Sequence, residues 1–334
     1  MGDAAGIGPE TLLLAARQGE LQDATVFGDL GVLQRAAAAV GGGLPLAVVA
    51  SPDDAVPPGA LRIWPVPDLP AGLAELPWGR VDARAGAAAA RCIEAAVAAV
   101  QVGQGRAIVT APIHKEALAA AGVPYPGHTE MLQALANPAA PPPVRMMLAN
   151  PELRVVLVTI HVSLRRAIEA LDFDAVLSTL RIAHQAARAW GQPAPRIAVA
   201  GLNPHAGEGG LFGDEEIRFI APAVQAARAE GIDAQGPLAP DTVFMRARRG
   251  AFDLVVAMTH DHGLIPVKYL GVEEGVNVTL GLPFVRTSPD HGTAFDIAGR
   301  GRADPASLVA ALRMARRLSD RPAGPQAAAP SDDS

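Results

Sequence analysis

Three short apolar runs of the chain each end in a polar cluster that contains a histidine. They are residues 155–160 before His161, residues 197–202 before His205, and residues 254–258 before His260. Short apolar runs rich in valine and isoleucine predict buried strands. Polar groups that follow such strands lie at their carboxyl ends, where open α/β sheets place their ligands. The pattern therefore predicts one site at the end of a sheet.

The rest of the chain alternates between short apolar runs and segments with helical periodicity. Further strands are expected at residues 24–27, 46–49, 61–66, 108–110, 144–148 and 276–280, and helices at 29–40, 82–102, 116–121, 174–190, 214–230 and 305–318, with another capped by Thr129. This alternation predicts α/β layers with much parallel sheet. A length of 334 residues exceeds what one core usually supports, so two domains are expected.

Composition narrows the class of protein. Half of the residues are apolar, 19% are charged and the formal net charge is −6, as in ordinary globular proteins. This mildly acidic balance argues against a nucleic-acid partner. No apolar run approaches the ~20 residues that span a bilayer, and no secretory signal is visible. Cys92 is the only cysteine, so no internal disulfide can form, and the cytoplasm is the expected compartment.

The three histidines that follow the apolar runs are candidate metal ligands. Neutral imidazole is the commonest side-chain metal ligand, and three imidazoles with one open position make a Lewis-acid site. Their spacing of tens of residues is no recognised zinc signature, and one such histidine alone is more often structural. Their shared position after strands favours a ligand cluster. Asp261 and His262 beside the third are candidates for orienting groups, for a base, or for solvated turn residues.

A second set of residues predicts an anion pocket. Lys268, Asn277 and Arg286 lie in a stretch dominated by apolar residues and glycine. A guanidinium that ends an apolar run must find a partner or reach water. A phosphate or carboxylate of a substrate would suit it bidentately, and a surface salt bridge is the alternative. His128 and Thr129 stand at an expected helix start, whose N–H groups favour the same anion.

Residues 290–299 form a third candidate site. Glycine and small residues there allow a ligand to approach the backbone closely, and Asp296 is placed to accept ribose hydroxyls. A locally capped helix start is the alternative. No G-x-G-x-x-G follows a strand in this sequence, so a Rossmann cofactor site is unsupported. A dinucleotide would therefore have to bind in another mode.

Six long motifs resemble the 4-hydroxythreonine-4-phosphate dehydrogenase family of pyridoxal phosphate biosynthesis. They are GDAAGIGPE from Gly2, TAPIHK from Thr110, GHTE from Gly127, GLNPHAGEGG from Gly201, HDHGLIPVK from His260 and GVNVTLGLPFVRTSPDHGTAFDIAG from Gly275. The resemblance extends to about residue 318. It implies an α/β fold of the isocitrate and isopropylmalate dehydrogenase type, with two domains and a cleft between them. Residues 1–122 and 282–320 would form the cofactor-side domain, and residues 123–281 the metal, substrate and dimerisation domain.

The family also implies a homodimer with a shared active site, a divalent metal (zinc, or magnesium or cobalt), and NAD or NADP. By motif, the metal ligands would be His161, His205 and His260, and in this family the third comes from the partner subunit. The substrate-binding residues would be His128, Thr129, Lys268, Asn277 and Arg286. The cofactor-binding residues would be His291, Gly292, Thr293 and Asp296. Asp241, Asp261 and Lys268 are the candidate proton acceptors.

The implied reaction is the oxidation of 4-hydroxythreonine 4-phosphate to 2-amino-3-oxo-4-(phosphooxy)butanoate, which decarboxylates to 3-amino-2-oxopropyl phosphate. The alternatives are a D-threonate or D-erythronate 4-phosphate dehydrogenase, a dihydrodiol dicarboxylate dehydrogenase, or a truncated, inactive dimer that binds nucleotide. The intact phosphate set disfavours the dihydrodiol substrate, and the intact histidines disfavour the inactive dimer.

The sequence departs from the family pattern at three places. The family usually has a strand before the first motif, so either the start of the chain is assigned too late or the first strand is missing. A missing strand is expected to lower stability, because it leaves a strand position in the sheet unpaired. His262 stands where the family commonly has glutamine, and Ala4 where it has proline. Neither change removes an implied ligand. Residues 321–334 are rich in proline, alanine, serine and aspartate and are expected to be disordered.

Overall fold

A computed structural model describes residues 1–271 and 273–320 of the protein. Its strands are β1 (Thr25–Gly28), β2 (Leu46–Val48), β3 (Leu61–Pro65), β4 (Ala107–Val109), β5 (Arg145–Ala149), β6 (Arg154–Leu157), β7 (Ile197–Ala200), β8 (Ala234–Leu238), β9 (Leu254–Ala257), β10 (Val276–Leu280) and β11 (Val285–Pro289). Its α-helices are α1 (Gly8–Arg17), α2 (Leu30–Ala39), α3 (Ala83–Gln101), α4 (Lys115–Ala120), α5 (His128–Ala136), α6 (Leu164–Glu169), α7 (Phe173–Ala189), α8 (Ala221–Ala229), α9 (Pro240–Arg248), α10 (His260–Tyr269) and α11 (Ala306–Ser319), with a 3₁₀ segment η1 (Pro204–Gly210) and a π-helical turn η2 (Glu216–Ile220).

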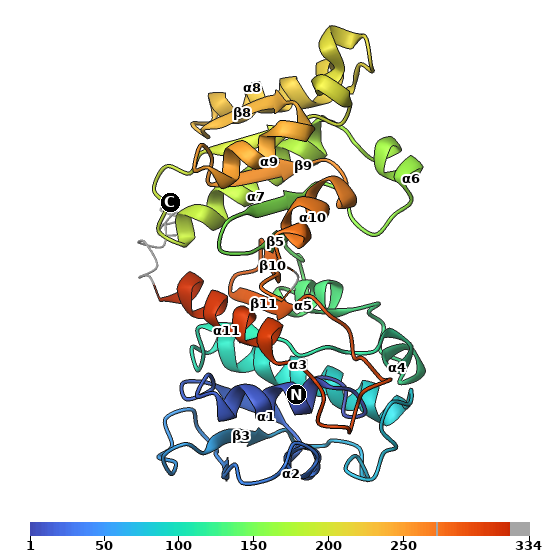
Figure 1. Ribbon diagram of the computed structural model, residues 1–334, viewed down its shortest axis with the longest axis vertical. Coiled ribbons are helices and arrows are strands. Elements are labelled where there is room, and N and C mark those ends of the chain that lie inside the picture. Colours follow the sequence, from blue (N-terminus) through green and yellow to red (C-terminus); the bar gives the residue numbers. More distant parts are fainter. Residues whose placement is uncertain (272, 321–334) are drawn as a thin grey trace, which may run out of the picture.

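The described strands form two separate sheets. Eight of them make one mixed sheet in the order β4-β11-β10-β5-β6-β9-β7-β8, and the other three make a smaller sheet in the order β1-β3-β2. Strands β6, β9, β7 and β8 run parallel to one another, whereas β5 and β10 are antiparallel to their neighbours. The predicted α/β architecture with much parallel sheet is therefore confirmed, and the molecule is elongated along the line of the two sheets (Figure 1).

Helices cover both faces of the large sheet, which explains the continuous apolar runs of its central strands. Along β9, Leu254 and Val256 pack in one cluster with α7 and α8. The alternate residues Val255 and Ala257 pack in another cluster with α9 and α10. The small sheet packs with α1, α2, α3 and α11. Because both faces of β9 are buried, all of its residues are apolar, and its polar neighbours begin only where the strand ends.

Several predicted helix starts are confirmed, and one is wrong. Asp29 and Asp82 cap α2 and α3, since their carboxylates accept hydrogen bonds from Val32 N and Arg84 N at 2.8 Å. Thr129 was expected to cap the next helix, but α5 begins at His128 after the extended Gly127. The glycine places the histidine, and not the threonine, at the very start of the helix.

Some helices and strands of the structure are not predicted by the sequence pattern. No helix is expected at residues 260–269, which carry Gly263 and Pro266, yet they form α10 with Pro266 inside it. Strand β8 contains Gly236 and Pro237, which weaken a strand signal but are tolerated at a sheet edge, where β8 lies. The predicted disordered tail, 321–334, falls outside the described residues. Among the helices that the structure describes, none is long and apolar enough to cross a membrane.

Candidate active site

Three adjacent parallel strands deliver the candidate ligands to one end of the large sheet. Strand β9 pairs in parallel with β6 on one side and with β7 on the other. His161 follows β6, His260 follows β9, and His205 follows β7. The sheet order thus confirms that the three histidine segments follow neighbouring parallel strands.

His161 and His260 lie together in this chain. Their ring centroids are 5.5 Å apart with an interplanar angle of 48°. Both line a cavity of about 280 Å³ with Thr159, Thr259 and His262. Burial is the main cause that lowers the pKa of His161, and the nearby His260 lowers it further. His161 is therefore neutral at pH 7, the protonation state that a metal ligand requires.

Asp261 fixes the orientation of His260. Its Oδ1 lies 2.8 Å from His260 Nδ1, although the carboxylate itself is 82% exposed. A carboxylate at one ring nitrogen holds that proton and leaves the other nitrogen, Nε2, free as a ligand atom. Of the roles open to Asp261, the geometry therefore favours the orienting one.

Replacing Asp261 with alanine is expected to weaken divalent-metal binding by about 10- to 100-fold, because the His260 ring loses the group that orients it. Titration of the metal-free protein with zinc, followed by calorimetry, measures the change. Glu169→Ala is the matched control, since this exposed carboxylate on α6 pairs only with Arg166 among the groups described. Equal affinity of the Asp261→Ala and Glu169→Ala proteins would contradict the orienting role.

His205 lies apart from this pair. It begins a run of six residues, His205 to Gly210, that all have positive φ, and its ring is 6.0 Å from that of Phe212. The Glu216 carboxylate braces the loop by accepting hydrogen bonds from Leu202 N at 2.7 Å and Asn203 N at 2.8 Å. Within the described part of the chain, no three His, Cys, Asp or Glu residues are grouped to hold a metal. One chain therefore brings together His161 and His260 and leaves His205 apart, which differs from the expectation that His260 is the ligand supplied by the partner subunit.

The predicted anion pocket centres on Arg286, which is 3% exposed. Its guanidinium donates to Thr279 Oγ1 at 3.0 Å and to Thr110 Oγ1 at 2.7 Å, and its buried Nε has no partner among the described residues. Burial lowers the pKa of Arg286 to about 10, so the group stays charged at pH 7. A buried cation with only hydroxyl partners fits an anionic ligand. Thr110 and Thr279 were not singled out from the sequence.

His128 faces the same pocket. Burial lowers its pKa well below the ordinary value, and the positive charge of Arg286 lowers it further. A neutral imidazole at the first residue of α5 adds a hydrogen-bonding group beside the guanidinium, and its buried Nε2 has no partner in the described structure. Thr129 follows it in the first turn of the helix. Asn277 lies on β10 opposite Ser288, two residues from Thr279 and therefore on the same face.

Lys268 connects the histidine cavity to the third candidate site. Its Nζ lies 2.7 Å from Asp290 Oδ2, so the last turn of α10 is joined to the start of the 290–299 loop. Of the three candidate bases, Lys268 is thus paired with Asp290 and Asp261 with His260. Asp241 is exposed in the first turn of α9.

The loop of predicted cofactor residues rests on the glycine-rich start of the chain. Thr293 O accepts a hydrogen bond from Ile7 N at 3.0 Å. Glu10, fully buried, accepts from Gly299 N and from Gly301 N, the latter at 2.9 Å. Gly292 and Asp296 are exposed, and His291 Nδ1 lies 3.0 Å from Gly292 O. The loop is therefore anchored at both ends and open in the middle. Glu10 was missed because its partners are backbone groups 289 and 291 residues away.

Solved structures share this fold closely. A 4-hydroxythreonine-4-phosphate dehydrogenase from Klebsiella pneumoniae superposes with a TM-score of 0.89 and 44% identity, over 96% of this chain and 97% of that one. A terephthalate 1,2-cis-dihydrodiol dehydrogenase from Burkholderia xenovorans LB400 superposes with a TM-score of 0.68 and 34% identity, over 95% and 96%. The fold and the site at the strand ends thus define a dehydrogenase with the isocitrate/isopropylmalate dehydrogenase-like fold.

Within that class, the chain belongs to the family of the pyridoxal phosphate biosynthetic protein PdxA, whose model matches residues 20–315. A 4-hydroxythreonine-4-phosphate dehydrogenase from Beijerinckia indica subsp. indica is 56% identical over 95% of this chain and 93% of its own length. A D-threonate 4-phosphate dehydrogenase from Cupriavidus necator is 49% identical over 96% of both chains. The two relatives are thus named for different substrates, 4-hydroxythreonine 4-phosphate and D-threonate 4-phosphate.

Proposed function

We propose that this protein oxidises 4-hydroxythreonine 4-phosphate with NAD or NADP to 2-amino-3-oxo-4-(phosphooxy)butanoate, which decarboxylates to 3-amino-2-oxopropyl phosphate. The observation that carries the proposal is Arg286, a buried cation whose side-chain partners in the described structure are two hydroxyl groups. A phosphate monoester supplies the missing anionic partner. The pKa of His161 responds to the charges of Lys115 and Glu130, on α4 and α5, so the histidine cavity faces the element that also carries His128.

The histidine pair fits a divalent metal. The two rings share one cavity, and Asp261 occupies Nδ1 of His260 and leaves Nε2 for the ion. When bound, a divalent cation such as zinc would act as a Lewis acid that lowers the pKa of the substrate hydroxyl. Imidazole ligands suit zinc and cobalt better than magnesium. The protein's part is to hold the ligand rings neutral and fixed.

The chain's own side chains orient the substrate. Arg286 and His128 would bind its phosphate, with Thr129, Asn277 and Lys268 completing the set. Lys268 would move between Asp290 and the substrate, because its ammonium is 39% exposed and lies on the same helix as His260. In that position Lys268 or Asp241 would accept the hydroxyl proton. His291, Gly292, Thr293 and Asp296 would hold the adenosine part of the cofactor, since Gly292 borders open space.

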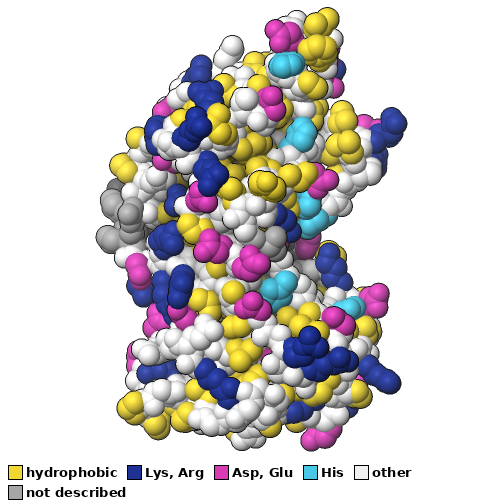
Figure 2. Space-filling model, viewed as in Figure 1, with side chains coloured by type: hydrophobic (Ala, Val, Ile, Leu, Met, Phe, Trp, Pro, Cys, Tyr) yellow, Lys and Arg dark blue, Asp and Glu magenta, His cyan; other side chains and the backbone are white. Residues whose placement is uncertain are grey.

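A homodimer would complete the site. Each histidine segment carries large apolar side chains that are exposed in the single chain. They are Val162 and Leu164 after His161, Leu211 and Phe212 after His205, and Ile265 and Tyr269 after His260. Histidines and hydrophobic side chains intermingle on the upper half of the molecule (Figure 2). Exposed apolar clusters mark interaction surfaces, so we propose that two copies meet where the metal binds.

The same contacts support the proposed domain division. Residues 123–281 would bind the metal, the substrate and the partner subunit, because they carry all three histidine segments and their exposed apolar neighbours. Residues 1–122 and 282–320 would form the cofactor side, where the 290–299 loop packs on the first ten residues.

The decisive experiment compares two phosphorylated substrates. Purified protein is assayed for NADH or NADPH formation with 4-hydroxythreonine 4-phosphate and with D-threonate 4-phosphate, which carries a hydroxyl where the first has an amine. We expect the larger kcat/KM for 4-hydroxythreonine 4-phosphate, and loss of activity with a chelator that zinc restores. A reversed preference would support the second function, which the Cupriavidus relative favours. No turnover of either substrate in the presence of zinc would refute both.

A further inference from the structure

The loop that carries His205 has an unfavourable backbone conformation. Residues His205 to Gly210 all have positive φ, and three of them, His205, Ala206 and Glu208, are not glycine. A side chain makes this conformation costly, so it persists only where surrounding contacts determine it. The loop must therefore be held by groups outside the run of positive φ.

Glu216, the first residue of η2, is such a group. Its side chain is 3% exposed. Its Oε1 accepts hydrogen bonds from Leu202 N at 2.7 Å and from Asn203 N at 2.8 Å, and its Oε2 accepts one from Asn203 Nδ2 at 2.9 Å. These donors lie two and three residues before His205. The carboxylate therefore fixes the direction in which the chain leaves β7 and enters the loop.

Two glycines make room for this carboxylate inside the loop. A Cβ atom at Gly201 would lie 3.0 Å from Glu216 Oε1, and a Cβ atom at Gly207 would lie 2.7 Å from Glu216 Oε2. Gly201 stands before His205 and Gly207 after it, so the carboxylate contacts both arms of the loop. Burying a charge costs free energy unless hydrogen bonds compensate, and bonds to a charged acceptor are the strong ones. Glu216 therefore links the two arms with more than apolar packing.

We propose that Glu216 is a positioning residue for the metal site, which holds the loop in its left-handed form and keeps His205 ready to bind the ion in the site of a second copy. This inference rests on the metal-binding dimer proposed above. A ligand that is ordered during folding need not be ordered by the metal, so less of the binding free energy is lost. Without Glu216, His205 would still be present, but the metal would have to order the loop.

The test measures zinc binding to the metal-free dimer by calorimetry. Glu216→Ala is expected to weaken zinc binding by about 10- to 100-fold, as losses of orienting groups around metal ligands do. Asp214→Ala is the matched control on the same segment, because this exposed carboxylate pairs with Arg218. It should stay within about threefold, since an exposed ion pair contributes little. His205→Ala, which removes the ligand itself, should weaken binding at least as much as Glu216→Ala.

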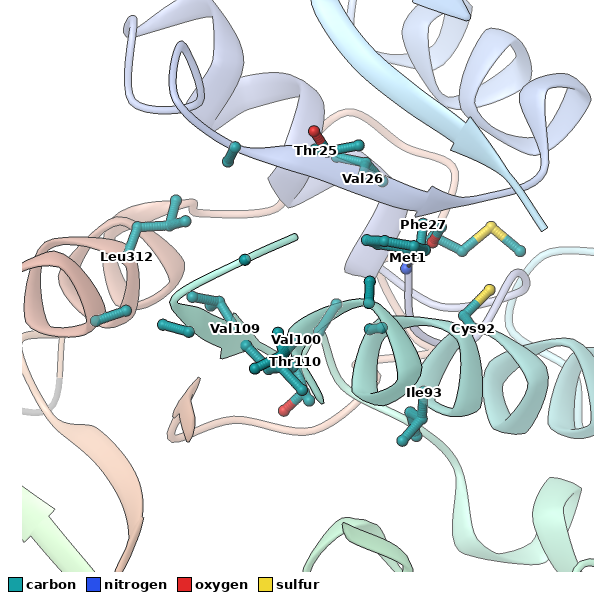
Figure 3. A pocket seen from close by; sticks show the side chains of 18 of the residues that line it. Met1, Thr25, Val26, Phe27, Cys92, Ile93, Val100, Val109, Thr110 and Leu312 are labelled. Carbon is teal, nitrogen blue, oxygen red and sulfur yellow. Dashed lines mark hydrogen bonds between the residues drawn. The ribbon is translucent and has the colours of Figure 1, made fainter. Parts of the chain in front are cut away.

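The zinc dependence of turnover separates positioning from a general structural defect. Turnover by the Glu216→Ala protein should rise with zinc and saturate at a higher concentration than in the unmodified protein. The His205→Ala protein should stay inactive at every zinc concentration. Labelling of Cys92 by a thiol reagent checks the other half of the molecule. This cysteine is the only one in the chain, is 4% exposed and lies on α3 near Met1 and Phe27 (Figure 3). Its labelling rate should be the same in all these proteins.

Glu216→Gln keeps the test decisive if the alanine variant does not fold. The glutamine oxygen can still accept from Leu202 N and Asn203 N, but its amide nitrogen would face Asn203 Nδ2, which is also a donor. Zinc affinity should therefore fall between those of the unmodified and the His205→Ala proteins.

Unchanged zinc affinity in the folded Glu216 variants, together with weakened binding in His205→Ala, would overturn the positioning role and leave the metal site standing. An equal loss in Asp214→Ala would also overturn it. Full zinc affinity in His205→Ala would overturn both this inference and the assignment of His205 as a ligand.

Discussion

Replacing Arg286 with methionine is expected to lower kcat/KM for the phosphorylated substrate by a factor of about 100 to 1,000. Hydrogen bonds to a charged group contribute about 1.5–3 kcal/mol each. Two of them between the guanidinium and the phosphate, taken at about 1.5–2 kcal/mol each, would supply about 3–4 kcal/mol, or two to three powers of ten. Steady-state kinetics with the phosphorylated substrate measures the loss. Because the phosphate is remote from the reacting hydroxyl, part of the loss should appear in kcat as well as in KM.

The thermal stability of the Arg286→Met protein, in contrast to its activity, is not expected to fall. Arg286 is buried beside two threonine hydroxyls, and burial lowers its pKa to about 10, so the free enzyme holds a charge that costs desolvation energy. Replacing a buried charged group with an apolar one of similar length is often neutral or stabilising. Thermal unfolding of the substrate-free protein should therefore show an unchanged or higher Tm. A protein that loses both Tm and activity would indicate a structural arginine instead.

Arg145 offers a matched control for this variant. It lies on β5, burial also lowers its pKa, and its Nε donates to Thr179 Oγ1 at 2.7 Å on α7. It resembles Arg286 in its hydroxyl partner, but that partner lies on α7 and is not one of the residues of the predicted anion pocket. Arg145→Met should leave kcat/KM within about threefold, since changes away from the site have small effects. An equal loss of activity in both variants would show that the effect of Arg286→Met is not specific to the pocket.

The local pattern of the sequence predicted the parts of the site that follow directly from strands. Residues 155–158 and 254–258 are apolar because both faces of their strands are buried, and polar residues such as Thr159 begin only where the strand has ended. Once these strands are parallel and adjacent, their ends coincide, and His161 and His260 must approach each other. The prediction succeeded here because burial on both faces of a strand requires a continuous run of apolar residues, which is visible in one short stretch of sequence.

The parts that were not predicted depend on register and on distant contacts. Thr279 reaches Arg286 because β10 and β11 pair antiparallel with these two residues opposite each other. Thr110, which follows β4, reaches it from 176 positions away in the chain. No local pattern encodes either pairing. The ion pair of Lys268 with Asp290 is of the same kind, since it depends on how α10 packs beside the end of β11.

His205 shows a different limit of the sequence. Its position after an apolar run is the same as that of the other two histidines, so the pattern treated the three alike. The loop after β7, however, turns through six residues of positive φ, and its histidine does not line the cavity that His161 and His260 share. A left-handed run of this kind is strained for residues other than glycine, and such strain is common at functional sites. A histidine that is held away from the cavity of its own chain could instead bind the metal in the site of a second copy.

Mixing two inactive variants is expected to restore activity if the site is shared between subunits. His205→Ala and His260→Ala should each lose metal and turnover when pure, because each removes one ligand from every site. In a mixed dimer, a shared site places both substitutions in one active site and leaves the other with all its ligands. Random exchange makes half of the dimers mixed, with one intact site each, so activity should recover to about a quarter of the unmodified level. Bound zinc per subunit should recover to the same fraction.

The control for this experiment follows from the geometry of one chain. His161 and His260 share a cavity in the same subunit, so under the proposed dimer His205 is the histidine that would bind the metal of a second copy. Mixing His161→Ala with His260→Ala should therefore give no recovery, because every site in a mixed dimer still lacks one ligand. Recovery in the first mixture and not in the second would assign His205 to the partner's site. If the first mixture stays inactive although exchange of labelled subunits is complete, all three ligands come from one chain and the loop after β7 must close over its own cavity.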